Sequence, residues 1–148
     1  HVQWYVAPPM LGEVVALQRA LGLTVVLDHL AGLHAGSEGL VAAWQALREL
    51  AQAGAWVKLS GWYRLQASAP YDALDLVIAR IGDLFGTRLV WGSDWPHPSI
   101  FSERKPWPDD ANMLDLLAAQ VPDERTRQRI LVTNPEILYG FGTSTRTA

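Results

Sequence analysis

Hydrophobic residues along this chain form short clusters that alternate with longer stretches of helical spacing. Four clusters rich in β-branched, aliphatic and aromatic residues predict strands, at positions 2–6, 23–27, 56–59 and 89–91. Each cluster precedes at least one segment whose apolar residues recur every three or four positions. These segments predict helices at 11–21, 40–53, 71–85, 111–120 and 124–132. Strand and helix therefore alternate along the chain.

The predicted helices carry recognisable end signals. A glycine, which easily takes the left-handed conformation that ends a helix, follows each of the first three, at Gly22, Gly54 and Gly86. A last short helix is predicted with Asn134 as its N-cap, Pro135 at its first helical position and Gly140 at its end.

The repeat of about 20–35 residues between strands favours parallel strands joined by crossover helices. We therefore predict an α/β fold of four βα units, half of a (β/α)8 TIM barrel, a fold that takes about 250 residues. Residues 1–142 would form this half barrel with its short C-terminal helix, and residues 143–148 a disordered tail.

A half barrel is expected to expose two sheet edges and an apolar inner face. The chain also begins inside a predicted strand, without an initiating Met. We therefore expect a fragment, the carboxyl-terminal half of something larger. The missing N-terminal half, or self-association, would be needed to close the barrel.

Composition narrows the classes of function. The 148 residues are 49% hydrophobic and 18% charged, with a formal net charge of −3, which fits one globular domain. The 12 lysines and arginines are scattered and form no basic stripe, which disfavours nucleic acid as a partner. No apolar run approaches the roughly 20 residues of a membrane span. We expect a cytoplasmic protein.

Several kinds of chemistry are disfavoured by missing motifs. The chain has no cysteine, which excludes disulfides, thiolate metal sites and cysteine nucleophiles. No phosphate-binding glycine pattern follows a predicted strand, so a dinucleotide fold has little support. No Gly-x-Ser-x-Gly motif is present, which disfavours the serine mechanism of α/β-hydrolases.

Polar residues at the carboxyl ends of the strands are the candidates for chemistry, because sites of parallel α/β folds form there. The second strand ends in Asp28-His29. Strand alternation places His29 on the face of Leu27, and Asp28 on the opposite face. His29 is a candidate ligand or acid/base, although a core histidine bonded to a backbone carbonyl fits the same pattern.

The third strand ends in Lys58-Leu59-Ser60-Gly61, followed by Arg64. Lys58 and Ser60 share a face, and Gly61 permits a sharp exit from the strand. A guanidinium in the following loop suits bidentate capture of a carboxylate. The alternative for Arg64 is a surface ion pair with a helix aspartate.

The fourth strand leads into Asp94, followed by a loop in which Pro96 and Pro98 flank His97. An aspartate at the end of a buried strand, followed by a rigid loop, is typical of a general base or a metal ligand. The alternative is an aspartate that only caps the next turn. Gly92, on the same face as Asp94, would leave space for a ligand.

Four segments occur in a telling order and spacing, namely VLDHLAG at 26–32, WVKLSGWYR at 56–64, LVWGSDWPHP at 89–98 and ILVTNPEILYGF at 130–141. Together they resemble the carboxyl-terminal half of amidohydrolase-superfamily barrels of the "amidohydrolase 2" type. Within that superfamily they are most similar to the 2-pyrone-4,6-dicarboxylate lactonase-like hydrolases. The resemblance covers nearly the whole chain.

The resemblance implies that the four strands are the fifth to eighth of the barrel. It implies that Asp94 activates the hydrolytic water, that His29 polarises the scissile carbonyl or binds substrate, and that Arg64 grips a substrate carboxylate. Further candidates for substrate binding are Ser60, His97 and Tyr5.

Metal use stays open at this point. The family's His-x-His pair belongs to the first strand of the barrel, which this chain lacks, and some relatives bind Zn²⁺ through that pair. The pyrone lactonase branch is thought to work without a divalent metal. We expect no cofactor, or one divalent metal (Zn²⁺) if the missing N-terminal half carries a His-x-His pair, with His29 and Asp94 as the ligands from this chain.

Three functions follow as hypotheses. The leading one is a hydrolase that opens a small carboxylated lactone by attack of water, with Asp94 as the general base. The second is a Zn²⁺-dependent decarboxylase or amidohydrolase on the same scaffold. The third is a non-catalytic half-barrel module, since a chain that lacks half of the barrel would be inactive alone.

Overall fold

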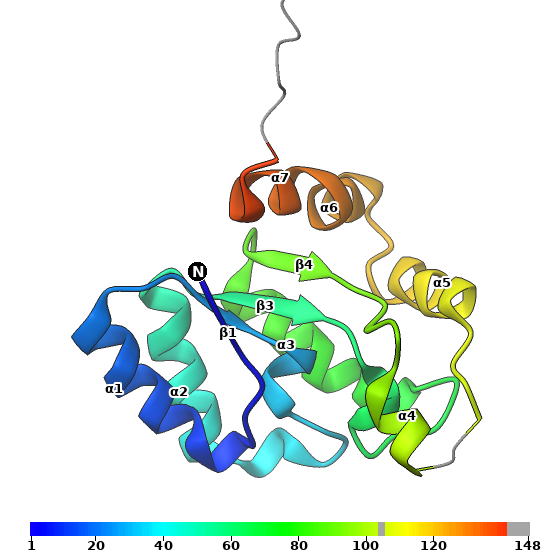
Figure 1. Cartoon of the computed structure of the whole chain (residues 1–148), viewed down its shortest axis with the longest axis horizontal. Coiled ribbons are helices and arrows are strands. Elements are labelled where there is room, and N and C mark those ends of the chain that lie inside the picture. Colours follow the sequence, from blue (N-terminus) through cyan, green and yellow to red (C-terminus); the bar gives the residue numbers. More distant parts are fainter. Residues whose placement is uncertain (104–105, 142–148) are drawn as a thin grey trace, which may run out of the picture.

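The structure is a computed structural model that describes residues 1–103 and 106–141 (Figure 1). Its centre is one parallel sheet whose strands lie in the order of the sequence. The strands are β1 (Val2–Trp4), β2 (Val25–Leu27), β3 (Trp56–Leu59) and β4 (Leu89–Trp91). This parallel sheet confirms the predicted α/β architecture, with the first two strands shorter than expected.

Three helices cover one face of the sheet and form the main core. They are α1 (Leu11–Leu21), α2 (Val41–Gln52) and α3 (Asp75–Phe85), which lie on the lower side of the strands in Figure 1. The sheet residues that face them are apolar and buried, namely Val25, Leu27, Val57, Leu59 and Leu89. The third predicted helix is two elements, because the single turn Asp72–Leu74 precedes α3.

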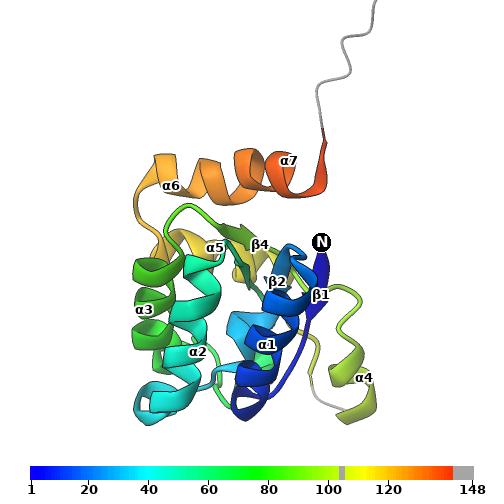
Figure 2. The same cartoon turned by 90° about the vertical axis from the view of Figure 1, so that its left-hand side faces the viewer.

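The opposite face of the sheet is covered by the end of the chain. Val26, Trp56 and Val90 point to this face and are buried, with Leu138 of α7 (Asn134–Tyr139) packed against them. Figures 1 and 2 both show α6 and α7 across the strands from α1–α3. The expectation that the apolar inner face is exposed is therefore wrong for these residues, because the last helix folds back over them.

The elements after β4 carry most of the differences from prediction. The loop after Asp94 contains a short helix, α4 (Pro98–Glu103), that the proline pattern concealed. Then come α5 (Asp110–Gln120), α6 (Glu124–Gln128) and a π-helical turn (Arg129–Thr133) that continues into α7. Short 3-10 turns also lie at Pro8–Met10, His29–Gly32, Ser37–Gly39 and Trp62–Arg64.

Asn134 is not an N-cap. Its backbone is helical (φ −67°, ψ −44°), because the preceding π-helical turn runs directly into α7. Its side chain is buried and donates from Nδ2 to the backbone oxygen of Leu89 at 2.7 Å. Asn134 thus ties the last helix to the start of β4, while Gly140 ends α7 in the left-handed conformation as predicted.

Among the described residues, β1 pairs with β2 alone and β4 with β3 alone, so the sheet does not close on itself. No helix in the described part of the chain has the length and apolar character to cross a membrane. The predicted tail, 143–148, lies outside the described residues.

Candidate active site

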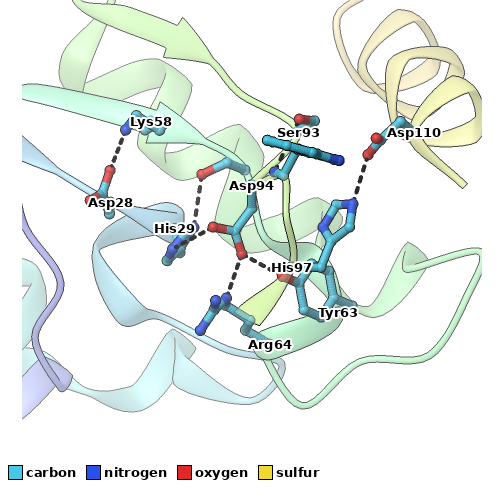
Figure 3. A network of polar contacts seen from close by, with 11 residues as sticks. Asp28, His29, Lys58, Tyr63, Arg64, Ser93, Asp94, His97 and Asp110 are labelled. Carbon is cyan, nitrogen blue, oxygen red and sulfur yellow. Dashed lines mark hydrogen bonds and ion pairs between the residues drawn. The ribbon is translucent and has the colours of Figure 1, made fainter. Parts of the chain in front are cut away.

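The polar residues predicted at three strand ends meet around the carboxylate of Asp94. In Figure 3 His29, from the end of β2, and Arg64, from the turn after β3, both point to this carboxylate. The Nε of Arg64 lies 2.6 Å from Oδ2 of Asp94, and Nε2 of His29 lies 3.6 Å from Oδ1. The convergence follows from the parallel sheet, since the carboxyl ends of all its strands lie at one edge.

The backbone leaves the strands sharply at two of these residues. Asp94 has a φ of +66° and His29 a φ of +50°, both in the left-handed region that side chains with a Cβ avoid. Such strained positions persist where the surrounding structure fixes them, and they concentrate at functional sites.

The left-handed turn begins beyond the strand. β2 ends at Leu27, Asp28 is still extended, and the positive φ starts at His29. The imidazole of His29 contacts the hydroxyl of Ser60, which follows the end of β3.

Tyr63 is a site residue that the sequence interpretation missed. Its hydroxyl donates to Oδ2 of Asp94 at 2.5 Å, so this oxygen accepts from both Tyr63 and Arg64. Tyr63 immediately precedes Arg64 in one 3-10 turn, which places both side chains on the same carboxylate. That adjacency is the signal from which its role could have been found.

Tyr5 lies on the opposite flank of the site. Its ring meets the imidazole of His29 edge-on, with 4.9 Å between ring centroids. The guanidinium carbon of Arg64 lies 5.6 Å from the Tyr5 ring and 5.5 Å from the Tyr63 ring. Arg64 is thus held between two aromatic faces, an arrangement that attracts a cation.

Ser60 contacts the histidine and not the open site. It is fully buried, and its Oγ lies 2.9 Å from Nδ1 of His29. A Cβ on the next residue, Gly61, would lie 2.5 Å from the same nitrogen. In this structure Ser60 therefore contacts the imidazole of His29, and its contact with a substrate stays a prediction.

Burial governs the protonation of the groups around Asp94. Burial lowers the pKa of His29 below 6.5, although the charges of Asp94 and Asp28 oppose the shift. Burial and the hydrogen bond to Asp94 raise the pKa of Tyr63 to about 12. At neutral pH, His29 is therefore uncharged and Tyr63 is a proton donor in its hydrogen bond.

Two further polar contacts flank the site. Lys58 pairs with Asp28 at 2.6 Å (Figure 3). Nε2 of His97 lies 3.1 Å from Oδ1 of Asp110 on α5, and the His97 ring contacts Tyr63 edge-on. His97 is only 2% exposed, so in this structure it packs against the Tyr63 ring and does not face the open site.

The described residues do not by themselves fit a zinc site. His29 and Asp94 supply two possible ligands, and one oxygen of Asp94 is already occupied by Tyr63 and Arg64. Protein zinc sites use three or four protein ligands. In the part of the chain that the structure describes, no group of three His, Asp or Glu side chains is placed to hold a metal.

An open cavity of about 340 Å³ lies beside Arg64. It is lined by Tyr5, Tyr63, Arg64, Gln66, Ala67, Ser68 and Ser99. The cavity gives solvent access to Arg64, whose Nε contacts Asp94.

A family model described as amidohydrolase matches residues 3–141. The chain belongs to the amidohydrolase family. A 4-sulfomuconolactone hydrolase of Rhizobium radiobacter is 32% identical over 141 residues, which cover 94% of this chain and 47% of that protein. A D-galactarolactone isomerase of Agrobacterium fabrum is 39% identical over 85 residues, covering 57% and 29%.

Among solved structures, the chain is similar to a probable 2-pyrone-4,6-dicarboxylic acid hydrolase from Acinetobacter baumannii, crystallised with citric acid bound. The TM-score is 0.80 with 26% identity, and the match covers 95% of this chain and 52% of that one. The chain thus spans about half the length of the relatives it matches. Its four parallel βα units are half of a (β/α)8 barrel.

Proposed function

We propose that this site hydrolyses a small lactone that carries an acid group, with Asp94 as the general base. The observation that carries the proposal is that the two carboxylate oxygens of Asp94 differ in their hydrogen bonds. Oδ2 accepts from Tyr63 and Arg64, whereas Oδ1 makes no hydrogen bond within the described residues. Relatives named as lactone hydrolases support the reaction class.

Oδ1 is the oxygen available to a water molecule. Tyr63 and Arg64 both donate to Oδ2 and thereby fix the orientation of the carboxylate. In the proposed step the water oxygen bonds to the lactone carbonyl carbon while Asp94 takes one water proton. The ring C–O bond then breaks, and that proton passes to the released ring oxygen.

His29 is proposed to act at the carbonyl oxygen. Its Nε2 lies on the same side as Oδ1 of Asp94, at 3.6 Å. If the Ser60 hydroxyl donates to Nδ1, the proton of the neutral ring resides on Nε2. An Nε2–H in that position donates to the oxygen on which negative charge develops during attack.

Arg64 is proposed to hold the acid group of the substrate. It lines the open cavity beside Asp94, and its guanidinium is charged at every relevant pH. A carboxylate or sulfonate bound there would fix the lactone ring next to Oδ1 of Asp94. Binding and base function thus come from adjacent side chains.

Replacement of the base tests the proposal. In the whole protein that carries this chain, Asp94→Asn should lower kcat for hydrolysis of an acid-substituted lactone by about 100- to 10,000-fold. The binding of the lactone acid should persist, because Arg64 remains. Asp83→Asn, at an exposed position of α3, is the matched control and should leave kcat unchanged. Near-normal turnover of Asp94→Asn would show that Asp94 is not the general base.

Isomerisation is the second candidate, because one relative is named as a lactone isomerase. The two reactions differ in the fate of water. Hydrolysis in H₂¹⁸O places one ¹⁸O in the carboxylate of the product, whereas isomerisation yields a lactone without it. The same assay excludes a decarboxylase if no CO₂ is released, and metal analysis tests the zinc-dependent alternative independently.

We also propose that a second set of strands completes the barrel. Because α7 covers the inner face of the sheet, association with other strands would occur at the unpaired edges of β1 and β4, whose backbone groups can pair with another strand. An N-terminal half or a second copy of the chain would pair with both edges. Light scattering of the isolated chain tests self-association, and a stable monomer would leave the N-terminal half as the partner.

A further inference from the structure

A second and larger cavity adjoins the site. It has a volume of about 860 Å³ and lies between the loop at 67–71 and helix α5. Tyr63, Ala67 and Ser68 line this cavity as well as the one beside Arg64. Figure 3 shows Tyr63 and His97 on the side of Asp94 that faces α5. A molecule bound at Arg64 is therefore separated from the large cavity only by this shared wall.

The lining of the large cavity is predominantly apolar. Its wall includes Pro70, Tyr71, Ile100, Trp107, Met113 and Leu116. Trp107 is 60% exposed although it is a large aromatic residue, and it contacts the ring of His97 edge-on. An exposed indole beside buried aliphatic residues provides an apolar surface that a ligand can cover.

The polar groups at the rim are partly engaged elsewhere. One oxygen of Asp109 accepts from the backbone N–H groups of Ala111 and Asn112, and the other accepts from the Asn112 side chain. Asp109 therefore caps α5 and is not directed to a ligand. Among the described residues that line the cavity there is no lysine or arginine, and most are apolar.

We propose that the large cavity binds an apolar, ring-sized substituent of the lactone. This inference rests on the proposed function, because it places the acid group at Arg64 and the reacting carbonyl at Asp94. The substituent then extends past Tyr63 and covers Trp107 and Met113. The substrate class is accordingly a lactone with an acid group on one side and a hydrophobic group on the other.

Two probes that differ by one phenyl group test this inference. They are 5-oxotetrahydrofuran-3-carboxylate and its 2-phenyl derivative, titrated calorimetrically into the Asp94→Asn variant of the whole protein, which should bind both without hydrolysing them. Burial of the phenyl group should tighten binding at least about tenfold, since each buried square ångström of apolar surface contributes about 25 cal/mol. Equal dissociation constants for the two probes would overturn the inference.

Variants on helix α5 locate the effect. Ala119 is exposed and lines the cavity, so Ala119→Phe should fill part of it and reduce the phenyl preference below about threefold. Ala118→Phe, at the neighbouring exposed position outside the lining, is the matched control and should keep the preference. An unchanged preference in Ala119→Phe would place the phenyl group elsewhere and overturn the inference.

Substitution of Trp107 gives a test that does not depend on filling the large cavity. Trp107→Ala should reduce the phenyl preference, and Trp107→Phe should restore most of it, while affinity for the unsubstituted acid stays constant. Arg64→Met separates the two proposals, because it should weaken both probes equally. If Arg64→Met changes neither affinity and the phenyl preference persists, the proposed role of Arg64 is overturned and the apolar cavity is not. Binding of neither probe would overturn both.

Discussion

The hydroxyl of Ser60 lies 2.9 Å from Nδ1 of His29, and Ser60 is fully buried. This contact joins the end of β3 to the end of β2 and fixes the rotation of the imidazole. Because Nδ1 faces Ser60, Nε2 faces Asp94 on β4. One buried hydroxyl thus relates three neighbouring strand ends, and the proposed chemistry depends on that relation.

The close approach of Gly61 to this imidazole gives the first prediction. A Cβ at Gly61 would lie 2.5 Å from Nδ1 of His29, and the residue has a φ of +64°. Gly61→Ala should therefore lose about 1–2 kcal/mol from the left-handed backbone, displace the ring and lower activity. Chemical denaturation and the NMR resonances of His29 measure the two effects.

Gly54→Ala is the control for backbone strain. Gly54 has a φ of +85°, and nothing lies within 4 Å of the position of its Cβ. This variant should lose comparable stability and leave the His29 resonances and activity unchanged. Equal displacement of His29 in both variants would show that the contact with Gly61 is unimportant.

The second prediction concerns the Tyr63 hydroxyl. Tyr63→Phe removes one of the two donors to Oδ2 of Asp94, and hydrogen bonds to charged groups contribute about 1.5–3 kcal/mol. We expect kcat to fall at least about tenfold, because Asp94 is no longer held in place by both donors. Tyr139→Phe is the control. Tyr139 lies on α7, and its hydroxyl accepts only an exposed hydrogen bond from Gln3, so this variant should behave as the parent protein. Steady-state kinetics distinguish the two variants.

The third prediction is a pH dependence of stability. The pKa of His29 in the folded protein lies below its unfolded value of 6.5. Between these two values the unfolded chain binds more protons, so the free energy of unfolding decreases as the pH falls below 6.5. Above 6.5 both states are neutral at this residue, and the penalty is absent.

Comparison with His29→Gln isolates this contribution from the other titrating groups. The parent protein should lose more stability than the variant as the pH is lowered from 7.5 to 5.5. Urea denaturation at a series of pH values gives the difference. A difference that stays constant over this range would contradict neutral burial of the imidazole.

The fourth prediction tests how the last helix is attached. Asn134 is buried and donates to the backbone oxygen of Leu89 at 2.7 Å. Asn134→Ala should cost about 1–3 kcal/mol, because a buried carbonyl loses its donor. Asn112→Ala, which removes an exposed bond to Asp109, should change stability by about 0.5 kcal/mol or less. Equal losses would mean that the Leu89 contact contributes little.

The sequence determined the order of strands and helices. Hydrophobic periodicity is a local property, and it can be recognised within short segments such as β3 and α1. It also indicated that His29, Arg64 and Asp94 would converge. Once strands are parallel and adjacent, their carboxyl ends must share one edge of the sheet.

Only the tertiary structure decided how these groups are arranged. His29 contacts Ser60 in a backbone turn whose positive φ begins at His29 itself, two residues after the end of β2. Tyr63 joins Asp94 through a contact 31 residues away in the sequence, which no local pattern encodes. The same holds for Leu138 of α7, which packs against the buried cluster of Val26, Trp56 and Val90 on the inner face of the sheet. Contacts of this kind depend on packing between distant segments, and packing is settled only when the whole chain has folded.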